Sequence, residues 1–184
     1  MTDRLFLAAA LSDDARHALV SRLEVMLPGG PPGRVVPPAN WHLTLRFLGA
    51  VTELQRDLLL AGLDGDLDVA PLRVRLTGLG AFPRAARATV LWVGAEDSED
   101  GLIRLAEGCE QAARDVGLAP EERPFHPHLT LARIRPARSV AALLDGADEA
   151  GVGFPVEAVT LYRTITGGSG TRYEQVDRVA LAGR

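Results

Sequence analysis

The chain has 184 residues, 47% of them hydrophobic and 24% charged, which suits one folded domain or two small lobes that share a core. Its formal net charge of −4 argues against a protein that coats long stretches of nucleic acid, but leaves room for a local basic pocket. The single cysteine, Cys109, excludes an internal disulfide and favours a reducing compartment. The sequence shows no pattern typical of a signal peptide or a membrane-spanning segment, so we expect a cytoplasmic protein with no membrane partner.

Periodicity predicts alternating strands and helices in the first half of the chain. Ser12 is a typical helix N-cap, and Thr52 with Gln55 forms the pattern of a capping box. The predicted elements are a strand over 1–11, a helix from Ser12 to Met26, a Gly- and Pro-rich loop over 28–38 with a short strand at 34–36, a strand over 41–48, a helix from Thr52 to Leu63 and a strand over 71–79.

The second half repeats this order. Gly117 is expected to end its long amphipathic helix, since glycine readily adopts the left-handed conformation at a helix C-terminus. The predicted elements are a strand over 88–93, a helix over 100–116, a proline-containing loop over 120–127, a strand over 128–134, a short helix over 139–144, and closing strands over 154–162 and 172–181 that flank a glycine-rich run at 167–170.

The tetrapeptide His-Leu-Thr-Leu occurs twice, beginning at His42 and at His128. In a strand, alternate side chains point to opposite faces, so each copy buries two leucines and presents a histidine beside a threonine, Thr44 or Thr130. For one copy, a structural histidine and a threonine of high β-propensity would be the better interpretation. The presence of two copies favours a functional interpretation of the motif, because packing alone does not require the same His/Thr face in both halves.

The two histidines lie 86 positions apart, and nearly the same offset relates Phe6 to Trp92 and Thr52 to Arg138. This offset indicates an internal duplication. We predict an α+β fold in which residues 1–184 form a single two-lobed domain. Two antiparallel sheets, flanked by helices, would surround a central cleft with pseudo-two-fold symmetry, so that both histidines face the cleft.

A pair of histidines in one groove is the simplest general acid–base pair near neutral pH, because the imidazole pKa of about 6.5 makes both protonation states accessible. Thr44 and Thr130 could hold a phosphate between the rings. His126 points the same way as His128, but no Cys, Asp or Glu stands at ligand spacing, so we expect no metal and no cofactor. His17 is expected on the surface.

Two longer segments carry a family resemblance. The sequence Val-Pro-Pro-Ala-Asn-Trp-His-Leu-Thr-Leu-Arg-Phe-Leu-Gly over 36–49 and the sequence Phe-His-Pro-His-Leu-Thr-Leu-Ala-Arg over 125–133 resemble the two signatures of the two-histidine phosphoesterases. The branch that they resemble is the bacterial and archaeal RNA 2′,3′-cyclic phosphodiesterases, also called 2′-5′ RNA ligases. The likeness extends to 80–83, 91–94, 161–163 and Tyr173, with Thr164 where serine is expected.

The resemblance implies a bilobal fold and the metal-independent hydrolysis of RNA terminal 2′,3′-cyclic phosphate to a 2′-phosphomonoester. It assigns His42 as the proton donor to the leaving 3′-oxygen and His128 as the proton acceptor that activates water. It also implies that Thr44, Thr130 and Arg133 bind the substrate phosphate. Strict alternation, however, places Arg133 on the opposite face from His128, so it reaches the groove only through a bulge or from the strand end.

Other groups near the motifs leave alternatives open. Arg46 shares parity with His42 and Thr44, yet a solvated arginine at a strand end is equally plausible. Trp41 or Phe47 could stack on a base, although parity favours the core for Phe47. Every basic residue is an arginine, suited to bidentate phosphate contacts. A basic surface for RNA is suggested by Arg84, Arg87, Arg133, Arg135 and Arg138.

The expected partner is an RNA 3′ end that carries a 2′,3′-cyclic phosphate; transfer-RNA fragments, 2′-5′ oligoadenylates and small cyclic nucleotides remain open. One alternative is 2′-5′ RNA ligation at the same site, which water would oppose. A second alternative, from another class, is a non-catalytic binder of 2′-phosphate or cyclic-phosphate ends. Two intact histidines count against a binder, since binding alone gains little from two titrating groups. We expect a monomer.

Overall fold

The computed structural model describes residues 2–168 and 170–182, so Met1 of the first predicted strand and Ser169 of the glycine-rich run lie outside the described residues. The strands are β1 (Thr2–Ala10), β2 (Arg34–Val35), β3 (His42–Thr52), β4 (Leu72–Phe82), β5 (Ala88–Glu96), β6 (His128–Arg138), β7 (Gly153–Val156), β8 (Ala158–Gly167) and β9 (Gly170–Ala180). The α-helices are α1 (Asp13–Met26), α2 (Glu53–Asp66), α3 (Gly101–Asp115) and α4 (Ala141–Asp145), and 3₁₀ turns lie at Pro38–Asn40 and Ala85–Arg87.

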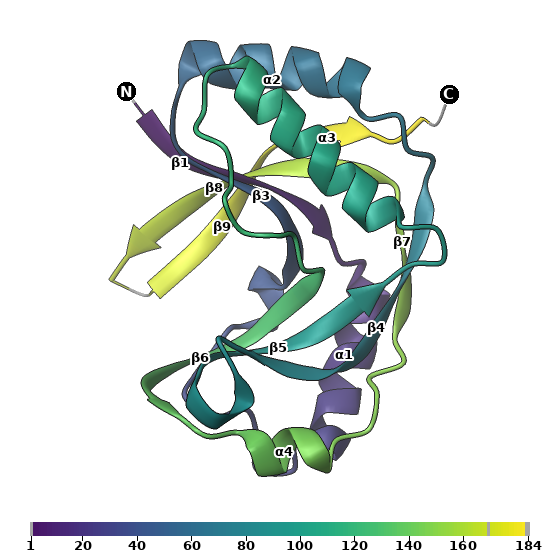
Figure 1. Ribbon diagram of the computed structural model, residues 1–184, viewed down its shortest axis with the longest axis vertical. Helices are drawn as coiled ribbons and strands as arrows, with labels where there is room; N and C mark the ends of the chain where they lie inside the picture. Colours follow the sequence, from purple (N-terminus) through teal and green to yellow (C-terminus); the bar gives the residue numbers. More distant parts are fainter. Residues whose placement is uncertain (1, 169, 183–184) are drawn as a thin grey trace.

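The strands form one curled antiparallel sheet in the order β7-β4-β5-β6-β3-β1-β8-β9, with β2 paired to β6 (Figure 1). We call β3, β1, β8 and β9 the first lobe, and β6, β5, β4, β7 and β2 the second lobe. Between the lobes, the register of β3 with β6 is a single pair, Leu43 with Leu129. The α+β class is therefore confirmed, and the two predicted sheets are the two halves of this sheet.

The duplication predicted from the 86-residue offset reappears in the strand bounds. Shifting β1 by 86 positions gives the bounds of β5, and shifting β3 gives those of β6. The spatial order is repeated as well, because β1 lies beside β3 as β5 lies beside β6. The pseudo-two-fold relation thus places the two motif strands side by side at the centre of the sheet.

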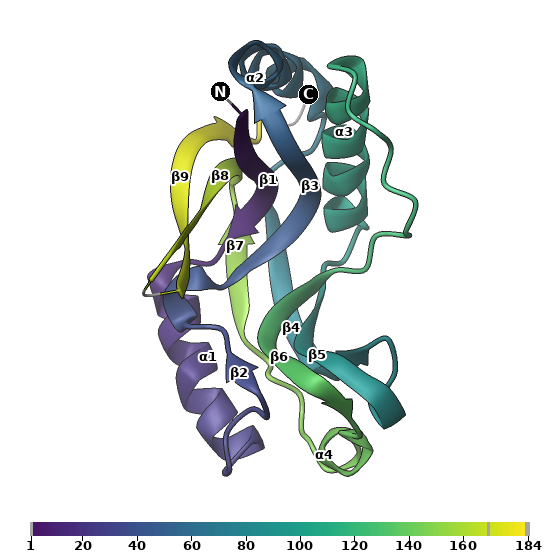
Figure 2. The same cartoon turned by 90° about the vertical axis from the view of Figure 1, so that its left-hand side faces the viewer.

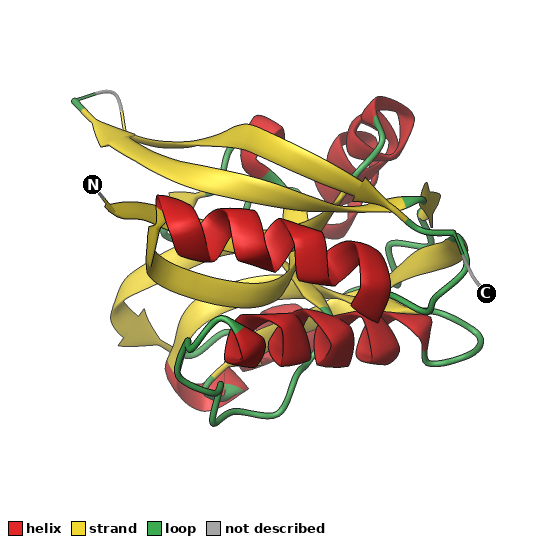
Figure 3. Cartoon of the chain, turned by 90° about the horizontal axis from the view of Figure 1, so that it is seen from above, coloured by secondary structure: helices red, strands yellow, loops and turns green. Residues whose placement is uncertain are grey.

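The helices connect the lobes as well as covering them. α3 follows β5 of the second lobe but packs on β3 and α2 of the first. α1 follows β1 of the first lobe yet lies beside the second, as Figures 1 and 2 show, and Arg22 on α1 donates to the carbonyl oxygen of Glu149. Figure 3 shows α2 and α3 side by side above the sheet. This exchange ties both lobes to a shared interior.

The helix starts follow the sequence in two cases and differ in a third. The Ser12 hydroxyl accepts a hydrogen bond from the Ala15 amide, and Thr52 forms the predicted capping box with Gln55. Asp100 begins α3 in the left-handed region, at φ 54°, with no side-chain cap bond. The cap comes instead from Asp97, whose carboxylate accepts from the amides of Gly101 and Leu102 at 2.6 and 3.0 Å.

The buried interior is one cluster of mostly aliphatic side chains contributed by both lobes. The inward faces of the motif strands lie at its centre, with Leu43 and Leu129 fully buried. Cys109 is also buried, on α3, as expected of a packed helix residue, and burial raises the pKa of its thiol to about 12. Among the described residues, no helix has the length and apolar character needed to cross a membrane.

One predicted strand is two strands in the structure. The run over 154–162 divides at Glu157 into β7, which pairs with β4 in the second lobe, and β8, which pairs with β1 in the first. The chain therefore crosses between the lobes in the middle of a segment that was predicted to be one strand. The carbonyl oxygen of Glu157 accepts from the Leu181 amide at 2.8 Å, which closes the end of β9 against this crossing.

Candidate active site

The two motifs meet across the seam between β3 and β6. Because Leu43 is in register with Leu129 in an antiparallel pair, His42 faces Thr130 and Thr44 faces His128 on the adjacent positions. Diagonal side chains in such a pair have their Cβ atoms about 7–8 Å apart. That separation leaves space for one phosphate between the two imidazoles.

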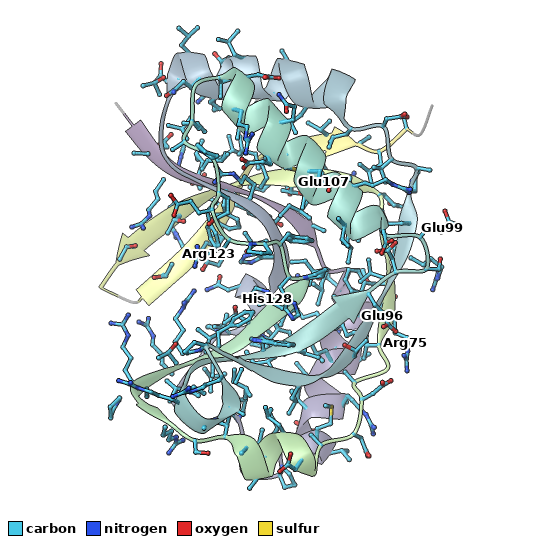
Figure 4. The ribbon with its side chains drawn as sticks, viewed as in Figure 1. Arg75, Glu96, Glu99, Glu107, Arg123 and His128 are labelled. Atoms are coloured by element: carbon cyan, nitrogen blue, oxygen red, sulfur yellow. The ribbon has the colours of Figure 1, made fainter. Side chains whose placement is uncertain are left out.

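A groove of about 820 Å³ lies over this seam. All five residues predicted for the site line it: His42, Thr44, His128, Thr130 and Arg133. Figure 4 shows His128 at the centre of the molecule, between Glu107 on α3 above and the strands of the second lobe below. The convergence of both motifs on one cleft, predicted from the duplication, is therefore present in the structure.

Both imidazoles are held in the same way by the backbone. The Nδ1 atom of His42 lies 2.8 Å from the carbonyl oxygen of Asn40, and that of His128 lies 2.6 Å from the carbonyl oxygen of His126. A carbonyl oxygen only accepts, so each Nδ1 carries the proton and each neutral ring has its lone pair on Nε2. In His42, Nε2 lies 2.9 Å from the Thr44 hydroxyl oxygen.

Aromatic rings surround each histidine, and the duplication extends to them. Phe6 lies 4.8 Å from the His42 ring centroid, and Trp92, at the equivalent position, lies 5.9 Å from that of His128. Tyr173 completes the first cage with an edge contact to His42 at 5.1 Å. Phe82 completes the second, at 4.9 Å from His128.

These surroundings disfavour a charged imidazole in both positions. Burial lowers the pKa of His42 to about 4; the Asn40 carbonyl opposes this shift, while the positive charges of His128 and Arg133 add to it. The pKa of His128 is also lowered, by burial first and then by His126 and Arg133, against the effect of the His126 carbonyl. Both rings therefore favour the neutral form at pH 7.

Arg133 reaches the groove through a bulge. The register of β5 with β6 shifts between Leu91, opposite Ala132, and Trp92, opposite Thr130. Leu131 and Ala132 are consecutive and both fully buried, so the alternation of faces restarts there. Arg133 consequently lines the groove with His128. Of the two possibilities that strand parity had left open, a bulge or the strand end, the bulge is present.

The same irregularity in β3 overturns two predictions. The register with β1 shifts between Leu7, opposite Arg46, and Ala8, opposite Thr44, and Leu45 and Arg46 are both buried. Phe47, expected in the core, is 54% exposed and lines the groove. For Arg46, a groove position and a solvated strand end had both been left open; it is 8% exposed, so the solvated alternative is wrong, and it lies in the wall of the groove.

The buried guanidinium of Arg46 is fully occupied by structural partners. Its Nε donates to Glu110 at 2.5 Å and one terminal nitrogen donates to the carbonyl oxygen of Ala119 at 2.5 Å, while the other contacts the carbonyl oxygen of Phe47. Glu110 also accepts from Arg114 and from the Glu121 amide. The network ties β3 to α3 and to the loop that leads into the second motif.

The positions of Trp41, His17 and His126 can be compared with their predictions. Trp41 is 6% exposed and its indole donates to the carbonyl oxygen of Val36 at 3.0 Å, so it cannot stack on a base. His17 is exposed on α1, as expected. His126 lines the groove with His128, their ring centroids 6.2 Å apart. Within residues 2–168 and 170–182, no three His, Cys, Asp or Glu side chains gather as a metal site would require.

Sequence reasoning did not assign positions to several groove residues. Asn40 both fixes His42 through its carbonyl and donates its side-chain amide to the carbonyl oxygen of Thr171 at 2.8 Å. Phe82 and Tyr173 come from strands at no fixed spacing from either motif, so only the sheet order brings them to the groove. The only available signal for Tyr173 was its place in the family-like segment.

Comparison with known proteins agrees with this geometry. The family model of the 2′-5′ RNA ligase superfamily matches residues 12–168. The chain belongs to this superfamily. A relative from Aeropyrum pernix, an RNA 2′,3′-cyclic phosphodiesterase, is 36% identical over 157 residues, covering 83% of this chain and 89% of the relative. Another of the same name, from Thermus thermophilus, is 35% identical over 190 residues, covering 98% and 91%.

Solved structures lead to the same family. A crystal structure of a protein from Thermus thermophilus has a TM-score of 0.81 at 33% identity and covers 97% of both chains. Escherichia coli LigT, complexed with 3′-AMP, has a TM-score of 0.77 at 29% identity, covering 98% of this chain and 99% of LigT. Together with the relatives' names, these matches make the chain an enzyme of the RNA 2′,3′-cyclic phosphodiesterase family.

Proposed function

We propose that this enzyme hydrolyses terminal 2′,3′-cyclic phosphates of RNA to 2′-phosphomonoesters with His42 and His128 as its acid–base pair, without a metal ion, and that residues 1–184 act as one two-lobed unit. The observation that carries the proposal is the shared orientation of the two rings. Each Nδ1 is bonded to a backbone carbonyl, which leaves both Nε2 atoms for proton transfer in one groove.

The proposed reaction is an in-line displacement at phosphorus. The neutral Nε2 of His128 removes a proton from water as the water oxygen bonds to phosphorus. The bond between phosphorus and the 3′-oxygen breaks on the opposite side, and the protonated Nε2 of His42 donates its proton to that oxygen. The products are a 2′-phosphomonoester and a 3′-hydroxyl group, and the enzyme leaves the cycle with His42 neutral and His128 protonated.

Three further side chains would stabilise the charge that develops on the phosphate. The hydroxyl groups of Thr44 and Thr130 stand beside the rings and can donate to the non-bridging oxygens. Arg133 brings a guanidinium to the groove face that His128 and Thr130 share, and its planar fork suits two phosphate oxygens at once. Thr44 also bonds to the Nε2 of His42, so phosphate binding and ring orientation are coupled.

Phe47 offers a surface for the base next to the cyclic phosphate. It is 54% exposed at the edge of the groove, where an aromatic ring can stack on any of the four bases. Phe47 also lines the same groove as His42 and Thr44, so a base stacked on it stays within reach of the motif residues. The proposal therefore places the terminal nucleoside against the first lobe and its phosphate at the seam.

The test is a short RNA that ends in a 2′,3′-cyclic phosphate, incubated with the purified enzyme in EDTA. We expect the 2′-phosphomonoester as the product, and no turnover above background in His42→Ala or His128→Ala, both checked for folding by circular dichroism. His17→Ala is the matched control and should keep full activity. Formation of a 3′-phosphomonoester, loss of activity in EDTA, or full turnover in either motif variant would contradict the proposal.

Ligation would use the same displacement with a different nucleophile, and the superfamily description names it. A 5′-hydroxyl group would replace water: its oxygen bonds to phosphorus as it loses its proton to His128, the bond to the 3′-oxygen breaks, and His42 protonates that oxygen, which leaves a 2′-5′ diester and a 3′-hydroxyl group. The partly exposed histidines and the exposed Phe47 leave the groove accessible to water, so we expect hydrolysis to dominate. Paired RNA halves with cyclic-phosphate and 5′-hydroxyl ends would reveal any joined product, while tight binding without turnover would indicate a binding protein.

A further inference from the structure

Four stretches of this acidic protein contain arginines but no Asp or Glu. Despite 24 Asp and Glu residues in the chain, none occurs in the stretches 25–52, 69–95, 123–144 and 158–173. These stretches supply the motif strands β3 and β6, the strands β2 and β5 and the tip of the β8–β9 hairpin. The motif strands β3 and β6 and the short strand β2 therefore contain no negative side chain, and the glutamates that line the groove come from α3 and the loop after it.

Six arginines in these stretches form what we call the arginine rim: Arg34, Arg84, Arg87, Arg135, Arg138 and Arg172. All six are exposed. None forms an ion pair with a described residue, whereas arginines elsewhere, such as Arg16, Arg75 and Arg114, pair with carboxylates. Unpaired, exposed guanidinium groups create a positive potential that attracts a polyanion.

The rim is continuous in space. Arg34 on β2 is in register with Arg133 on β6, and a Cβ on Gly170 would lie 3.2 Å from the Arg34 guanidinium, which brings the hairpin tip and Arg172 to the same edge. Arg135 follows Arg133 on the exposed side of β6, since Ile134 between them is buried. Figure 4 shows nitrogen-tipped side chains projecting between the β8–β9 hairpin and the end of β6.

The turn before β5 extends this edge. Arg138 is in register with Ala88, and the Val140 amide donates to the carbonyl oxygen of Ala85. The turn that carries Arg84 and Arg87 is therefore held against the end of β6. The rim thus runs outward from Arg133, which lines the groove, over the surface next to it.

The opposite side of the groove carries glutamates, two of which are paired with arginines. Glu107 and Glu110 on α3 and Glu121 in the following loop all line it. Figure 4 places Glu107 above the groove and Arg123 at its outer edge, and Arg123 is paired with Glu121. Because Glu110 and Glu121 are paired with arginines, this side attracts a nucleic-acid backbone less than the unpaired arginines of the rim do, and the charge difference places a bound strand on the rim side.

We propose that the arginine rim binds the phosphate backbone of single-stranded RNA on the 5′ side of the terminal cyclic phosphate. The inference rests on the proposed function and adds a substrate class to it. The enzyme prefers oligonucleotides to cyclic mononucleotides, because only an oligonucleotide carries backbone phosphates that reach the rim while its end occupies the seam. This preference weakens as salt rises, since each backbone contact releases condensed counterions.

The experiment compares an RNA of about eight nucleotides ending in a cyclic phosphate with 2′,3′-cyclic AMP, between about 50 and 200 mM salt. The test variant is Arg135→Gln/Arg138→Gln. The matched control is Arg4→Gln/Arg73→Gln, two exposed arginines of β1 and β4 without ion pairs to described residues. We expect the test variant to raise the KM for the RNA about tenfold and to lower the slope of log KM against log salt by about 0.7 per lost contact.

The KM for cyclic AMP should change little in the test variant, and the control should stay within about twofold of the wild type for both substrates. Equal KM and equal salt dependence for the two substrates in the wild type would overturn the inference while leaving the proposed function intact. An identical rise in KM for the test and control variants would overturn it too, because general loss of positive charge would then explain the effect.

If the proposed function is wrong, the expected result is an absence of turnover rather than a change in KM. If neither substrate is turned over, the rim is judged by fluorescence anisotropy with a labelled RNA of the same length that ends in a 2′-phosphate. Weaker binding in the test variant than in the control would still support the rim as an RNA surface. Equal binding, or binding that does not depend on salt, would exclude it.

Discussion

The proposed donor, His42, has a pKa of about 4 in the free protein, yet it must hold a proton when the 3′-oxygen leaves. The substrate itself can resolve this conflict, because a phosphate between the rings places a negative charge next to each imidazolium. At about 4 Å, with an effective dielectric constant of about 20, one such charge contributes about 4 kcal/mol. That energy is large enough to raise the pKa of His42 well above about 4.

Histidine NMR can measure this shift directly, since the chain has only four histidines. We expect the pKa of His42 to be about 4 in the free protein and clearly higher with a saturating 2′-nucleotide product. His17, which is exposed on α1 and does not line the groove, serves as the internal control for the assignment. The alkaline limb of kcat should accordingly lie at higher pH than that of kcat/KM, because kcat describes the complex and kcat/KM the free enzyme. An unchanged His42 pKa in the complex would refute this reasoning, and a rise confined to His128 would exchange the donor and acceptor roles.

Three substitutions test the surrounding scaffold. Arg46→Ala leaves Glu110 charged and partly buried, so urea unfolding should show that the free energy of unfolding falls by about 3 kcal/mol. The double variant Arg46→Met/Glu110→Leu should recover most of this stability. Equal losses in the two variants would contradict a buried ion pair. Gly80→Ala would place a Cβ 2.1 Å from the Trp92 ring, so we expect the free energy of unfolding to fall by about 1–3 kcal/mol and kcat to fall as well. Unchanged Trp fluorescence would show that the Trp92 ring is not displaced. Phe47→Ala should raise KM about 10-fold through lost stacking with little change in kcat, and Phe47→Tyr should restore it; a KM unaffected by Phe47→Ala would exclude base stacking there.

The sequence predicts most of the site because strand alternation and duplication are local signals. His42, Thr44, His128 and Thr130 obey the two-residue period and lie on the groove face as predicted. The 86-residue offset even reproduces the bounds of β5 and β6 from those of β1 and β3. Both signals are properties of neighbouring residues, and they hold wherever the backbone remains regular.

The errors arise where the backbone is irregular. A bulge is defined by how a strand pairs with its neighbour, and no sequence pattern marks Leu45 or Leu131 as the residue where the faces change. The residues directly beyond these points are therefore assigned to the wrong side by strict alternation, as happened with Phe47. The division of 154–162 at Glu157 has a similar cause, because it depends on which strand each part pairs with.

The two bulges also explain how a duplicated scaffold acquires an acid and a base with different surroundings. Position for position, Phe47 in β3 corresponds to Arg133 in β6, since both follow their motif histidine by five residues. Each bulge delivers its residue to the groove, so one lobe presents an aromatic ring and the other a cation. If the aromatic ring holds the base and the guanidinium holds the phosphate, the substrate can bind in only one of the two orientations that the pseudo-symmetry would otherwise allow. The asymmetry of these two side chains then decides which histidine faces the leaving 3′-oxygen and which faces water.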